Sequence, residues 1–225
     1  MEVTRVETHQ ISKNHELFNF CDRKCYESKN LYNKVNYIMR QRFTESEGYK
    51  KDNFNSNYYS LTTEFRKIDE AKVMASNFYE PVMKLISKDW KSFFKSIKDW
   101  KKNKNKYNGK PNLPGYAPTG KDGRKTAINR KLNRRKDGTF KFSGEKVYFT
   151  PQTDNELKQA RIVPKPNNDN VEYYNLEIVY KKEIPETKEK EEKIAGIDLG
   201  LNNLATVVTN CEVKPIMING KPVKS

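Results

Sequence analysis

Asp198 is the first candidate for chemistry, because it lies within an apolar run of the sequence. The run, Ile194-Ala195-Gly196-Ile197-Asp198-Leu199-Gly200, predicts a strand that is buried on both faces. A carboxylate inside such a strand is unfavourable unless its charge is compensated, and a divalent cation is one such compensation. Gly196 and Gly200 keep side chains away from Asp198, so that a phosphate could approach. The alternative is a turn aspartate that closes an ordinary hairpin with residues 201–208.

A row of lysines on one predicted helix is the second candidate. At about 100° per residue, six lysines fall within roughly 40° of one direction. They are Lys84, Lys88, Lys91, Lys95, Lys98 and Lys102. The apolar residues of this helix cluster on the opposite side and predict its buried face. They are Ile86, Trp90, Phe93, Ile97 and Trp100. Like charges at this spacing destabilise an isolated helix, and a bound phosphate backbone would remove that cost. A solvated lysine face is the alternative interpretation.

The excess of basic residues is concentrated in one part of the chain. The 225 residues contain 44 Lys and Arg and 29 Asp and Glu, which gives a net charge of +15. Residues 84–136 contain 18 basic and 3 acidic residues, a difference equal to the net charge of the whole chain. A general enrichment of lysine in the protein would spread the excess charge along the sequence, so this concentration favours a binding surface for nucleic acid.

A segment rich in Pro, Gly and basic residues follows the lysine helix, over residues 101–125. It predicts extended or turned backbone. Such a segment could lie along a phosphate track and stack aromatic rings on bases, or it could be a flexible linker. The candidate nucleic-acid-binding residues here and just beyond are Lys110, Tyr116, Arg124, Lys125, Arg130, Arg134 and Arg135.

The elements that must position these residues form an α+β pattern. Residues 2–10 predict a short strand. Apolar residues at steps of three and four then predict helices over about 15–43 and 61–78 and from Pro81 onward, with a loop over 44–57. From Thr139, alternating segments separated by turn residues predict several short strands and a small barrel or sandwich. These segments are 140–142, 147–149, 161–163 and 173–180, with turns at 137–138 and 167–170. The charged run 181–193 predicts an exposed linker and a domain boundary.

The cysteines and the hydropathy exclude several classes of protein. The sequence has three cysteines, and this small, odd number argues against a secreted disulfide scaffold. Cys21 and Cys25 lie one helical turn apart, and their spacing fits no standard zinc pattern, so a zinc site is not expected. We expect them instead to act as small apolar residues in helix packing. The sequence has neither a long apolar stretch that could span a membrane nor a signal peptide. We therefore expect a cytoplasmic bacterial protein.

The segment Gly196 to Thr206 resembles the first RuvC motif of TnpB, the RNA-guided nuclease of bacterial insertion sequences and a relative of type V CRISPR effectors. Upstream segments resemble the same family in the same order. Lys29-Asn30-Leu31-Tyr32-Asn33 is similar to the opening of its recognition helices. Residues 109–116 are similar to the segment that re-enters its wedge barrel, and residues 158–165 and 174–183 to the last strands of that barrel. The resemblance covers nearly the whole chain.

The resemblance implies a domain organisation. Residues 1–12 would be the first strand of a small, OB-like wedge β-barrel, which 106–187 would complete. Residues 13–105 would be a helical recognition domain inserted into this barrel. Residues 193–225 would begin an RNase H-like RuvC nuclease domain. The implied partners are a guide RNA and a target DNA, with sequence read by base pairing and by recognition of a short flanking DNA motif.

The resemblance also implies a catalytic role for Asp198, as a ligand of two Mg²⁺ ions about 4 Å apart. The family needs a later Glu and a later Asp and usually carries paired cysteines between them, whereas only Glu212 follows Asp198 as a carboxylate. We therefore expect a truncated TnpB-like protein that binds nucleic acid but does not cut it alone, with the missing RuvC portion as a possible further partner. The alternatives are a nuclease-dead RNA-guided repressor of transcription and a generic basic RNA-binding protein.

Overall fold

The computed structural model describes residues 1–45, 54–117, 123–167, 170–184, 193–200, 203–211 and 213–220. The chain divides into two compact units. One comprises residues 2–183, and the other comprises Met1 together with the residues from Ile184 onward. The subdivision of the first unit into a recognition domain and a wedge domain stays a prediction.

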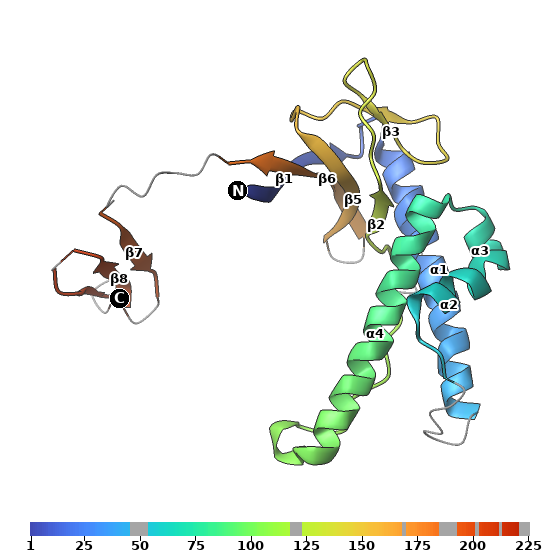
Figure 1. The fold of residues 1–225 in the computed structure, drawn as a ribbon, viewed down its shortest axis with the longest axis horizontal. Coiled ribbons are helices and arrows are strands. Elements are labelled where there is room, and N and C mark those ends of the chain that lie inside the picture. Colours follow the sequence, from blue (N-terminus) through green and yellow to red (C-terminus); the bar gives the residue numbers. More distant parts are fainter. Residues whose placement is uncertain are drawn as a thin grey trace. The chain divides into compact units, whose positions relative to one another are not determined.

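The first unit is of the α+β class. Its helices are α1 (Phe18–Glu45), α2 (Tyr58–Glu64), the 3-10 turn η1 (Phe65–Lys67), α3 (Asp69–Lys72), α4 (Ser76–Lys102) and the 3-10 turn η2 (Lys104–Lys106). Its strands are β1 (Glu2–Ser12), β2 (Ala127–Arg130), β3 (Phe140–Lys141), β4 (Tyr148–Phe149), β5 (Glu156–Asn167) and β6 (Asn170–Glu183). In Figure 1, α1 and α4 extend from the sheet with α2 and α3 beside them.

The predicted barrel is not closed among the residues described. An open, fully antiparallel sheet has the strand order β1-β6-β5-β2, and β3 and β4 form a separate two-stranded ribbon. Alternating sequence predicts strands but carries no information on whether the two edges of a sheet meet. The sequence also missed β2, because its four residues lie within a basic stretch that reads as loop. Of the predicted turn at 167–170, Asn168 and Asp169 lie outside the described residues.

The helix predicted over 61–78 is wrong, because the chain breaks there into α2, η1, α3 and the start of α4. Ile68 and Ala75 have extended backbone angles and separate these pieces. Arg66 holds the bend, since its Nη1 donates to the carbonyls of Ala71 at 3.1 Å and Met74 at 3.0 Å. The predicted first helix and first strand are confirmed, with ends shifted by two or three residues. The predicted loop at 44–57 falls largely outside the described residues, including Gly48.

The core of this unit joins both long helices to the sheet. Leu31, Val35, Trp90 and Ile162 are all fully buried. The side chain of Cys25 donates from Sγ to the carbonyl of Ile162 at 3.3 Å, which ties α1 directly to β5. This packing fixes α4 relative to the sheet and therefore positions the lysines that α4 carries. Within the described residues, no helix is long and apolar enough to cross a membrane.

The second unit contains an antiparallel sheet of β7 (Ala195–Asp198), β8 (Asn203–Thr209) and β9 (Ile216–Asn219), with β8 in the middle. The predicted hairpin is present, although its turn residues Leu201 and Asn202 lie outside the described residues. The expected burial of its first strand is wrong, since every residue of β7 is exposed. The described strands of this unit are too few and too short to cover an apolar strand on both faces.

Candidate nucleic-acid interface

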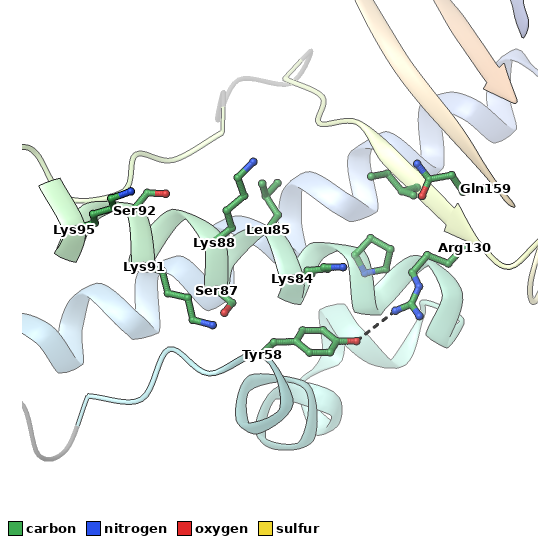
Figure 2. Close-up of a pocket in the computed structure, with 12 residues that line it drawn as sticks. Tyr58, Lys84, Leu85, Ser87, Lys88, Lys91, Ser92, Lys95, Arg130 and Gln159 are labelled. Atoms are coloured by element: carbon green, nitrogen blue, oxygen red, sulfur yellow. Dashed lines mark hydrogen bonds between the residues drawn. The ribbon is translucent and has the colours of Figure 1, made fainter. Parts of the chain in front are cut away.

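An open groove of about 680 Å³ runs along the exposed face of α4. Four residues of the predicted lysine row line it, and Figure 2 shows them in succession along the helix. They are Lys84, Lys88, Lys91 and Lys95. Arg130 from β2, Gln159 from β5 and Tyr58 from α2 also line it, and Figure 2 shows Arg130 and Gln159 beyond the Lys84 end of the row. The structure thus brings five of the sequence-predicted cations to one place.

The amphipathic pattern of α4 is the reason that the lysines share this face. All six lysines of the row are exposed, as the sequence predicts. The apolar residues Ile86, Trp90, Phe93 and Ile97 are buried on the opposite side, whereas Trp100 is only partly buried. The indole Nε1 of Trp90 donates to Oδ1 of Asn36 on α1 at 3.2 Å. This bond joins the buried face of α4 to α1, opposite the lysines.

The four groove lysines lack carboxylate partners among the described residues. None of Lys84, Lys88, Lys91 and Lys95 forms an ion pair there. Their spacing of three and four residues makes them neighbours on the helix surface, so their mutual repulsion is uncompensated within this part of the protein. Such a surface attracts a polyanion. Lys98 and Lys102 continue the row beyond the groove.

Arg130 differs from the lysines because it is held in place. Its Nη1 pairs with Oε2 of Glu80 and lies 3.4 Å from the hydroxyl of Tyr58. The Tyr58 hydroxyl also donates to Oε2 of Glu80 at 3.1 Å. These three side chains come from β2, α2 and α4, and their bonds fix the guanidinium in the groove.

Four other predicted cations have partners within the protein. Arg124 donates from Nε and Nη2 to the two carboxylate oxygens of Asp22, at 2.8 and 2.9 Å. Arg134 donates to the carbonyls of Gly138 and Thr153. The remaining two are Arg135, which pairs with Asp137 at 3.4 Å, and Lys125, whose ammonium lies 3.8 Å from the ring centre of Tyr32. Burial lowers the pKa of Lys125.

The segment after α4 is anchored to α1 rather than free. Asn36 donates from Nδ2 to the carbonyls of Pro114 and Gly115, both at 3.0 Å, and Arg40 donates to Pro114 at 2.8 Å. Two further bonds join the side chain of Asn33 to the backbone of Ala117. These contacts argue against a flexible linker over 113–117. The predicted binding residues of this segment, Lys110 and Tyr116, are both exposed, and the Arg40 guanidinium covers the Tyr116 ring at 5.0 Å.

Asp198 does not lie in a metal-binding cluster within the described residues. Its side chain is exposed, and it is the only carboxylate among the described residues from 193 to 220, since Glu212 lies outside them. A two-metal centre needs several converging carboxylates. The residues that the structure describes here therefore do not fit the Mg²⁺ site that the resemblance implies.

Cys21 and Cys25 are fully buried in α1, which confirms that they act as small apolar residues in helix packing. Burial, with a smaller contribution from Asp22, raises the pKa of the Cys21 thiol to about 12. Burial also raises the pKa of Cys25 far above its ordinary value. Thiols of this kind are weak nucleophiles, because the thiolate is the reactive form.

Sequence reasoning missed Tyr58, Glu80 and Gln159 as neighbours of the lysine row. They come from separate elements. Gln159 lies in the segment 158–165 that resembles a barrel strand, and Tyr58 and Glu80 belong to no motif.

In β2, Ala127 and Asn129 are buried and alternate with the less buried Ile128 and Arg130, which is the two-residue period of a strand. This alternation was the available signal for β2, but the surrounding basic residues obscured it.

No protein-family model matches the chain, and no curated protein matches it. Among solved structures, the chain is similar to one described as the cryo-EM structure of a Cas12f1–sgRNA–target DNA complex, with 10% sequence identity and a TM-score of 0.36. The match covers 98% of this chain and 58% of the other.

Proposed function

We propose that this chain binds the phosphate backbone of nucleic acid through the groove along α4. The observation that carries the proposal is the row of four exposed lysines that line one groove without carboxylate partners among the described residues. Each lysine that neutralises a phosphate releases a condensed counterion, and this release drives binding at ordinary salt.

We further propose that the chain is TnpB-like and that its ligands are a guide RNA and a target DNA. The support is the order of the TnpB-like segments along the sequence, ending with Gly196 to Thr206, together with the concentration of positive charge in 84–136. Because the described residues around Asp198 do not fit a two-metal site, no cleavage step is assigned to this chain.

The test is to purify the chain at moderate salt and to sequence the RNA that stays bound. One discrete, structured RNA, released by the triple change Lys91→Ala, Lys95→Ala and Lys98→Ala, would support a retained guide. The matched control changes three exposed lysines away from the groove, Lys136, Lys141 and Lys146, and should retain the RNA. Heterogeneous RNA that salt removes equally from all three proteins would contradict the proposed guide RNA.

A salt titration tests the groove itself. Replacing Lys84, Lys88, Lys91 and Lys95 by Ala should reduce the slope of log K against log salt on duplex DNA, by about 0.9 for each phosphate that the variant no longer neutralises. An unchanged slope in this variant would contradict the groove as the binding surface.

A further inference from the structure

The cations of the α4 groove belong to two chemically different kinds. The lysines carry point charges on flexible side chains, which suit phosphate oxygens but do not discriminate between bases. Arg130 carries a planar guanidinium that Glu80 and Tyr58 hold in one orientation. Two such kinds of cation in one groove indicate two separate tasks.

The pairing of Arg130 with Glu80 changes what the guanidinium can recognise. The carboxylate offsets the positive charge and therefore weakens the attraction of Arg130 for a phosphate. Only Nη1 is occupied by this pairing, and Nε and Nη2 make no hydrogen bond with any described residue. Two adjacent N–H donors of a planar guanidinium match the O6 and N7 acceptors of a guanine, which is the commonest specific contact between a protein and a base.

The surroundings of Arg130 suit a base rather than a free ion. Arg130 and Gln159 are cross-strand partners of β2 and β5, and both line the groove. Gln159 brings an amide that can donate and accept hydrogen bonds. Ile128, two residues before Arg130 on β2, and Pro81, next to Glu80 on α4, supply apolar surface to the same groove. A phosphate gains nothing from apolar surface, whereas the bases of a duplex also offer apolar contacts, such as the thymine methyl group.

We infer that Arg130, positioned by Glu80 and Tyr58, reads a guanine of duplex DNA whose backbone the α4 lysines hold. This inference rests on the proposed function. Duplex DNA is the expected form because its major groove exposes O6 and N7, whereas the narrow major groove of an A-form RNA duplex hides them. Glu80 and Tyr58 act as positioning residues, since they act through Arg130.

The test uses the full chain and a pool of DNA duplexes of one length with a randomised centre. Bound and unbound duplexes are separated at fixed salt and sequenced. We expect the wild-type chain to enrich guanine at one position by about five-fold or more. Arg130→Lys keeps the charge but loses the planar pair of donors, so it should weaken the enrichment while leaving affinity for the whole pool within about two-fold, because the lysines still hold the backbone.

Further variants separate positioning from structure. Glu80→Gln should weaken the enrichment with little loss of pool affinity, and Asp69→Asn, the same change at an exposed carboxylate outside the groove, should leave both unchanged. The double change Lys88→Ala and Lys91→Ala should lower pool affinity and keep the guanine preference. A purely structural role for Glu80 would instead lower affinity and preference together.

Three outcomes would overturn the inference, and they differ in what else they overturn. A wild-type chain that binds the pool without a guanine preference, or a preference that Arg130→Lys leaves unchanged, would refute base reading by Arg130 and leave the lysine groove intact. A wild-type chain that does not bind the pool would refute both this inference and the proposed binding of DNA.

Discussion

The ammonium of Lys24 on α1 lies 2.6 Å from a carboxylate oxygen of Glu145 in the segment between β3 and β4. Lys24 is 1% exposed, and its second carboxylate partner is Glu27 at 2.8 Å. The same Glu145 receives the guanidinium of Arg23, at 3.1 and 2.9 Å. This network fastens the β3–β4 segment to the helix beneath it, and a buried ammonium without a partner would be costly.

We expect Glu145→Gln to lower the free energy of unfolding by about 3 kcal/mol, since it leaves the buried charge of Lys24 with one partner fewer. Urea denaturation followed by circular dichroism measures the change. The control is Glu156→Gln, which removes a carboxylate from the more exposed pair with Lys158 and should have a much smaller effect, because water screens an exposed pair. Equal losses in the two variants would contradict a special role for the Lys24 network.

The same network predicts a loss of stability in acid. Hydrogen bonds from Arg23 and then from Lys24 hold the pKa of Glu145 below its ordinary value of 4.5. A lowered pKa in the folded protein contributes stability that is complete above the ordinary value and is lost as the pH falls through the folded value. The stability difference between wild type and Glu145→Gln should therefore shrink below pH 4.5. A difference that stays constant down to about pH 3 would show that the carboxylate charge is not its source.

Substitutions of Arg124 and Lys88 should affect different properties, stability for Arg124 and DNA binding for Lys88, although the sequence assigns both residues to nucleic-acid binding. Arg124→Gln removes two bonds to Asp22 and should cost about 2 kcal/mol of stability without changing the salt slope of binding. Lys88→Ala should change stability by less than about 0.5 kcal/mol and reduce the slope by about 0.9. Thermal unfolding and anisotropy titrations at several salt concentrations provide both readouts. A salt slope of binding that Arg124→Gln lowers would show that Arg124 contacts the nucleic acid.

The cysteines should differ sharply in reactivity. Burial raises the pKa of Cys21 to about 12 and also raises that of Cys25 well above its ordinary value, whereas Cys211 is partly exposed. At about pH 8 a thiol reagent should modify one thiol per folded chain, Cys211→Ser should remove that reaction, and all three should react in denaturant. Rapid modification of two or more thiols in the folded chain would show that α1 opens readily.

We expect the purified chain alone not to cut DNA in the presence of Mg²⁺, since Asp198 is the only carboxylate among the described residues of its sheet. A plasmid-nicking assay with and without a bound guide checks this, with Asp198→Ala as the control for contaminating nucleases. Mg²⁺-dependent cleavage that Asp198→Ala abolishes would refute it.

The local pattern of residues was sufficient to predict much of this protein. The helical spacing of lysines and aromatic residues predicted both faces of α4, because a helix has a fixed angular repeat that sorts side chains in space. The alternation of residues 173–180 predicted most of β6 for the equivalent reason in a strand. The concentration of positive charge in residues 84–136 predicted a binding surface in the segment that supplies most of the groove's cations.

Only the tertiary structure decided which of the predicted arginines face the groove. Arg124, Arg134 and Arg130 are equivalent in the sequence, but the first two lie opposite Asp22 or backbone carbonyls, and Arg130 lines the groove. The meeting of Arg130 with Glu80 and Tyr58 joins residues up to 72 positions apart. A local pattern specifies the direction of a side chain relative to its own element, and only the packing of elements against one another specifies what lies in that direction.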